Sequence, residues 1–76
     1  MKPHYGIIGR LYKTKRDDIY VTAYLHRDCW RYNQNTHTIP AGTTVLVIAQ
    51  STFVHTLVAL AGEQLVFIYR DLLESI

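Results

Sequence analysis

The residues best suited to chemistry lie in the middle of the chain, where His26, Cys29 and His37 form the spacing H-x2-C-x7-H. A structural zinc site needs four such ligands, so a fourth would have to come from a distant histidine or from Asp28. Cys29 beside a histidine could also act as a nucleophile, but no oxyanion-hole glycine motif follows it. A lone cysteine is more often a small packed residue. We therefore expect no metal, no cofactor and no catalysis.

A second group of residues interleaves aromatic rings with basic side chains around two predicted loops. Rings beside guanidinium groups can stack on nucleic-acid bases while the cations contact phosphates. The same residue types dominate protein interfaces, because they bury much surface at low entropic cost. A third interpretation is structural, with Trp30 and some tyrosines closing one end of the fold. The candidate partner-binding residues are Tyr12, Lys13, Arg16, Tyr20, Tyr24, Arg27, Trp30, Arg31 and Tyr32.

Length and composition limit the architecture that can position these residues. The chain has 76 residues, enough for one domain spanning 1–76, and 49% of them are hydrophobic. A single cysteine excludes an internal disulfide, so stability has to come from an efficient core. No secretory signal follows Met1, and polar residues interrupt the apolar run 45–61. We expect a cytoplasmic protein without a membrane span.

The net charge of +2 hides two unlike halves. Residues 1–38 hold seven basic and three acidic side chains, whereas residues 39–76 hold one basic and three acidic ones. Six of the nine aromatic residues also lie in the first half. The sequence therefore predicts a scaffold in the second half and a functional surface in the first.

The hydrophobic pattern predicts an all-β fold, because apolar residues alternate in short runs separated by turn residues. Pro40 and Gly42 mark the clearest turn, and Gly62 marks a tight hairpin. We interpret 26–38 as the least regular stretch, a loop around Asn33-Gln34-Asn35 in which 29–32 could form a short strand. About five strands are expected, at 7–13, 19–25, 44–49, 53–60 and 64–69, followed by a helical turn at 70–76.

Alternation within two strands raises the question of which face is buried. In 19–25 the aliphatic set Ile19, Val21, Ala23 and Leu25 is the expected core face. In 53–60 both sets are mixed, so either could face the core, and His55 is partly buried in one case and exposed in the other. Together with Val66 and Ile68, the outer set would leave an apolar stripe suited to a second copy or a partner.

The order of these elements resembles the small SH3-like barrels. The resemblance implies a small barrel of about five strands, with an OB-like barrel as the alternative, and makes the loops 14–18 and 26–38 neighbours. It does not imply binding of proline-rich peptides, because Arg10-Leu11-Tyr12-Lys13 lacks an acidic partner and Trp30 is followed by Arg31. The residues that carry the likeness are Ile39, Pro40, Ala41, Gly42, Thr43, Val45, Val47, Gly62, Val66, Tyr69 and Leu72.

These observations predict a non-catalytic module that binds a protein partner through its aromatic and arginine-bearing loops. The small size suggests a stand-alone adaptor, or an inhibitor from a phage or mobile element. The alternative is a nucleic-acid-binding barrel that uses the basic first half. A homo-oligomer is left open, and no membrane partner is expected.

Overall fold

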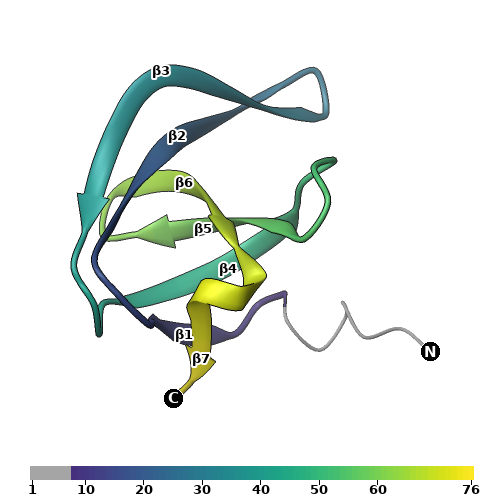
Figure 1. Ribbon diagram of the computed structural model, residues 1–76. Coiled ribbons are helices and arrows are strands. Elements are labelled where there is room, and N and C mark those ends of the chain that lie inside the picture. Colours follow the sequence, from purple (N-terminus) through teal and green to yellow (C-terminus); the bar gives the residue numbers. More distant parts are fainter. Residues whose placement is uncertain (1–7) are drawn as a thin grey trace.

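The computed structural model describes residues 8–76, which form a single antiparallel sheet with seven strands and one 3₁₀ turn (Figure 1). Their spatial order is β3-β2-β6-β5-β4-β1-β7, and the sheet is not closed, so β3 and β7 are its edges. The all-β prediction is confirmed, but a closed five-stranded barrel is not. The elements are β1 (Leu11–Thr14), β2 (Asp18–His26), β3 (Cys29–Ile39), β4 (Thr44–Gln50), β5 (Thr56–Ala61), β6 (Gln64–Tyr69), η2 (Arg70–Leu72) and β7 (Leu73–Ser75).

The central meander β4–β5–β6 follows the pattern that the sequence predicts. Glycines with positive φ form two of its turns: Gly42 has φ 80° in the turn before β4, and Gly62 has φ 64° between β5 and β6. The Thr14 hydroxyl holds the first turn by donating to the Pro40 carbonyl at 2.8 Å and accepting the Thr43 N–H at 3.1 Å. The predicted strand 64–69 coincides with β6.

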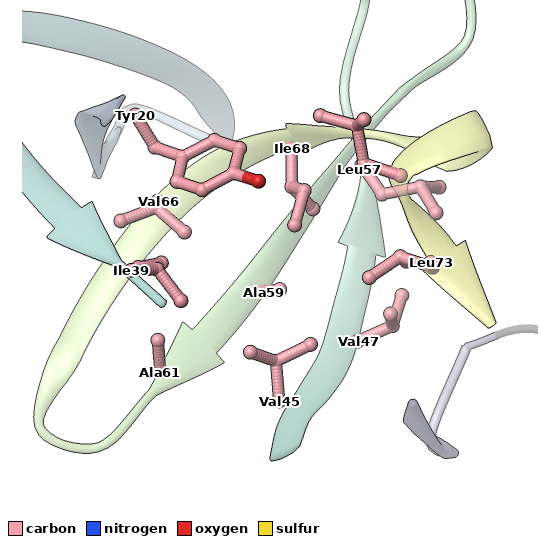
Figure 2. Close-up of a cluster of buried hydrophobic side chains, with 11 residues drawn as sticks. Tyr20, Ile39, Val45, Val47, Leu57, Ala59, Ala61, Val66, Ile68 and Leu73 are labelled. Carbon is pink, nitrogen blue, oxygen red and sulfur yellow. The ribbon is translucent and has the colours of Figure 1, made fainter. Parts of the chain in front are cut away.

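The core lies on both faces of the meander. In β5, which covers most of the predicted strand 53–60, side chains of both alternating sets are therefore buried. Strand β5 is in the middle of the sheet order, and five of its six residues are buried. Because neighbouring side chains point to opposite faces, Val58 packs in a small second cluster with Ala23 and Phe67. The main cluster (Figure 2) consists of Tyr20, Ile39, Val45, Val47, Leu57, Ala59, Ala61, Val66, Ile68, Leu72 and Leu73.

The predicted apolar stripe on this part of the sheet is absent, because Val66 and Ile68 are buried in the main cluster. The segment 53–55 was also expected in a strand and instead forms the loop before β5. His55 is exposed there and adopts a left-handed φ of 59°. A residue with that φ cannot continue a β ladder, so the strand begins only at Thr56.

The predicted core face of β2 is wrong. The side chains of Tyr20 and Thr22 lie on the face of the sheet that carries the main cluster, and they are 5% and 4% exposed. Ile19 is 62% exposed and Leu25 is 56% exposed. Of the four aliphatic residues only Ala23 is buried, against Val58 and Phe67 on the other face. The physical reason is that the second face is covered only in the middle of β2, while a tyrosine ring fills more of the main core than an aliphatic chain would.

The stretch 26–38, interpreted as an irregular loop that could hold a short strand at 29–32, is mostly the 11-residue strand β3, which includes 29–32. Arg27 and Asp28 form a two-residue turn with φ 52° and 66°, the backbone signature of a type I′ hairpin. The Asn-Gln-Asn run lies within β3, as a bulge. Between the pairs Val21↔Thr36 and Ala23↔Tyr32 the register advances two positions on β2 but four on β3.

The two ends of the chain also differ from prediction. Strand β1 spans Leu11–Thr14 and begins later than the predicted 7–13, of which residue 7 lies outside the described part. The predicted helical turn 70–76 is only η2, after which β7 pairs with β1 in the register Lys13↔Glu74. None of the helical segments in residues 8–76 has the length and apolar character needed to cross a bilayer.

Candidate functional site

Because most of the predicted loop 26–38 is strand β3, only the turns that contain Arg16 and Arg27 remain of the two loops expected to be neighbours, and they lie at opposite ends of β2. The charged turn that contains Arg16 precedes this nine-residue strand, and the turn with Arg27 follows it. At about 3.3 Å per residue, the strand separates them by roughly 27 Å. Tyr12, Lys13 and Arg16 therefore cannot share a compact site with Arg27 and Arg31. The prediction of one continuous aromatic and basic surface from these two loops is wrong.

The aromatic residues of the predicted site divide into core and surface. Tyr20 belongs to the main cluster, and Tyr12 packs half-buried against that cluster. Trp30 is half-buried against the second cluster. Tyr24 and Tyr32 are exposed on the β2–β3 hairpin. These two rings are the exposed aromatic residues of the predicted set, at 43% for Tyr24 and 57% for Tyr32.

Tyr32 lines a groove that the sequence did not reveal. It lies beside the first half of β2, where the ladder to β6 is a single pair, Thr22↔Val66. The β4–β5 loop and the end of β6 form the other side. Its volume is about 490 Å³, and its lining residues are Asp18, Ile19, Tyr20, Val21, Tyr32, Phe53, Val54, Thr56, Phe67, Tyr69 and Leu72.

Phe53 is the centre of an aromatic row along this groove. Its ring centroid is 6.2 Å from that of Tyr32 and 5.5 Å from that of Phe67, the latter in an edge-to-face arrangement at 81°. Such geometry is favourable for rings because their edges and faces carry opposite partial charge. The row connects the β2–β3 hairpin to the meander and keeps the groove walls in place.

The loop that presents Phe53 and Val54 is built by two buried hydroxyl groups. The Ser51 hydroxyl accepts the Phe53 N–H at 3.0 Å and donates to the Thr56 carbonyl at 3.0 Å. The Thr56 hydroxyl donates to the Val54 carbonyl at 3.1 Å. Val54 is 76% exposed and Phe53 is 47% exposed. Two adjacent apolar residues after the Ser-Thr turn were the signal that sequence reasoning missed.

A second pocket, of about 400 Å³, adjoins the groove and shares Tyr32 and Phe53 with it. We call it the amide pocket. Its lining differs from that of the groove in carrying side-chain amides and a cation. The residues of the amide pocket are Tyr24, Arg31, Tyr32, Asn33, Gln34 and Phe53.

Charge is sparse and lies at the two ends of this combined surface. Asp18 is the only ionised side chain lining the groove, and it pairs with Arg16 at 3.6 Å. Arg31 is the only one lining the amide pocket. Between them the Tyr20 hydroxyl is buried with no hydrogen-bond partner among residues 8–76. Burial raises the pKa of Tyr20, the Asp18 carboxylate raises that pKa further, and Arg16 opposes both.

The histidine and cysteine residues do not converge. His26 and Cys29 are directly opposite each other across the hairpin turn, whereas His37 pairs with Tyr20 near the other end of β3. His55 is exposed in the β4–β5 loop, and His4 lies outside the described residues. Within 8–76, no three His, Cys, Asp or Glu side chains are grouped to hold a metal ion.

Comparisons of the chain with models of protein families, with curated proteins and with solved structures gave no match.

Proposed function

We propose that the protein is a non-catalytic binding module that holds an apolar segment of a protein partner in the groove. One observation carries the proposal. Isolated exposed apolar residues are ordinary on a protein surface, but a contiguous concave group marks an interaction site. The exposed members of this group are Ile19, Val21, Tyr32, Phe53, Val54 and Tyr69.

The groove and the amide pocket contain only some of the residues that the sequence predicts to bind a partner. Tyr32 is retained in the groove and Tyr24 and Arg31 in the adjoining pocket. Tyr20 contributes to the floor from the core, and the residues near Arg16 lie beyond the far end. A cytoplasmic adaptor or an inhibitor from a phage or mobile element stays a prediction, as does self-association.

We also propose that the sheet is an opened variant of the SH3-like barrels. The features on which that resemblance rests support the proposal: the Pro40–Gly42 turn into β4, the Gly62 hairpin and the turn after β6. The pairing of β7 with β1 brings the last strand back beside the first, as barrel-like folds require.

The groove is tested by placing a photocrosslinking amino acid at Val54 and, as the control, at Glu63 in the β5–β6 turn. Both positions are exposed, so neither replacement disturbs the core. The expected result is a specific protein crosslink from position 54, absent from position 63 and lost when Ile19→Asp is introduced. Equal crosslinking from both positions, or insensitivity to Ile19→Asp, would refute binding in the groove.

A second candidate function is binding of single-stranded nucleic acid at the amide pocket. The specific observation is that three rings and two amide side chains surround Arg31 there, a combination that stacks on and hydrogen-bonds to unpaired bases. It predicts that a mixed single-stranded oligonucleotide binds at about 50 mM salt and dissociates as salt rises toward about 200 mM. Absence of binding at the lower salt concentration excludes this function.

A further inference from the structure

We propose that the partner segment bound by the groove carries a carboxylate, which Arg31 and Asn33 bind in the amide pocket. The inference rests on the proposed protein-binding function, because it assigns a partner chemistry to the same surface.

Arg31 provides the positive charge for a carboxylate. It lies opposite Tyr24 in the β2–β3 register and is exposed. The one ion pair found within residues 8–76 joins Arg16 to Asp18, at the other end of β2. The Arg31 guanidinium is therefore not neutralised by an acidic side chain of the described chain. Its planar fork of N–H donors matches the two oxygens of a carboxylate.

Asn33 provides a neutral donor whose direction is set by the bulge. Its Oδ1 accepts the Thr22 hydroxyl and, at 2.8 Å, the backbone N–H of Asn35. A backbone N–H can only donate, so the atom it contacts must be the oxygen and the amide nitrogen must point elsewhere. Thr22 is buried in β2 and fixes the side chain. No hydrogen bond from Nδ2 to another described residue is found, and Asn33 is one of the residues that line the amide pocket.

The apolar part of the partner follows from the geometry of the groove. Tyr32 and Phe53 line both cavities, so a chain can pass from one to the other without leaving an apolar surface. From Asp18 to Tyr24, the register partner of Arg31, β2 covers six residue steps. That is roughly 20 Å, the length of about six extended residues.

The two charged ends give the bound segment a direction. Arg31 attracts an acidic group at one end, and the Asp18 carboxylate disfavours one at the other, although Arg16 partly compensates it. The surface therefore suits an extended apolar or aromatic segment of about six residues with Asp, Glu or a terminal carboxylate at the Arg31 end.

The test is selection from a phage-displayed library of random dodecapeptides, performed in parallel on the wild-type chain and on Arg31→Glu. The wild type should enrich apolar runs with an acidic residue on one side, and Arg31→Glu should enrich the same runs with Lys or Arg instead. For one enriched peptide, Arg31→Gln should raise Kd about tenfold, as loss of a charge-assisted pair does. Arg27→Gln removes the same charge from the hairpin turn and should change Kd less than about twofold.

The outcomes distinguish this inference from the proposed function. One outcome is that the selected peptides lose binding to Val54→Asp, and so require the groove, but show no preference for an acidic residue. That outcome would overturn the proposed carboxylate and retain binding in the groove. Equal increases in Kd for Arg27→Gln and Arg31→Gln would also overturn the proposed carboxylate and retain binding in the groove. No peptide sensitive to Val54→Asp would refute both. Because Arg27 and Arg31 are exposed, both variants should melt as the wild type does, and Arg31→Lys, which keeps the charge without the fork, should lose less affinity.

Discussion

Replacing Tyr20 by phenylalanine should stabilise the protein, although Tyr20 is among the most buried rings of the core. Its hydroxyl is buried and lacks a hydrogen-bond partner within residues 8–76 (Figure 2 shows it among the aliphatic side chains of the main cluster). A buried polar group without a partner costs about 1–3 kcal/mol in lost solvation. Tyr20→Phe removes that cost and keeps the ring, so the free energy of unfolding should rise by about 1–2 kcal/mol.

Thermal unfolding followed by circular dichroism measures this effect. For a domain of this size, each kcal/mol shifts Tm by about 4–8 °C, so Tyr20→Phe should raise Tm by at least several degrees. Tyr24→Phe is the matched control, since Tyr24 is exposed and loses only a solvated hydroxyl. Its effect should be within about 0.5 kcal/mol. A lower Tm for Tyr20→Phe would refute the reasoning, because it would mean that the hydroxyl is hydrogen-bonded in solution.

The pH dependence gives an independent check on the same hydroxyl. Burial raises the Tyr20 pKa above its ordinary value of 10.0, with Asp18 adding to the effect and Arg16 opposing it. Above pH 10 the unfolded chain therefore loses this proton before the folded one, and stability falls as pH rises. Below pH 10 both states keep the proton, and Tyr20 contributes no slope. The wild type should lose stability above pH 10 more steeply than Tyr20→Phe does. Tyr24→Phe is the control, and its loss of stability above pH 10 should be as steep as that of the wild type.

Further expected outcomes concern the bulge, one turn and the two surface sites. Asn33→Ala should lower the free energy of unfolding by about 1–2 kcal/mol in denaturant titration, because Thr22 and the Asn35 N–H lose their acceptor. Gly62→Ala should cost about 1 kcal/mol, since φ is 64° and the added Cβ meets no other atom within 4 Å. Groove binding should be lost in Val54→Asp without a change in Tm. Carboxylate-bearing peptides should bind Arg31→Gln about tenfold more weakly.

Much of the meander follows from local sequence. Strands β4 and β6 are apolar runs, each preceded by a turn whose glycine has positive φ, and both could be placed from residue types alone. Strand β3 could not, because its polar residues carry no strand signal and its turn, Arg27-Asp28, lacks the usual glycine or asparagine. Pairing with β2 holds β3 as a strand, although the composition of β3 does not favour one.

The candidate site divides in the same way. Residue types alone predict an all-β chain with aromatic and basic side chains concentrated in its first half. They do not predict that Tyr20 is buried in the core, that Ile19 faces outward or that Phe53 contacts Tyr32, all of which follow from the packing of the strands. The reason is that alternation assigns residues to two faces but does not say which face other strands cover. That depends on contacts distant in sequence, and on β2 pairing with β6 only at Thr22, which leaves the groove beside the first half of β2.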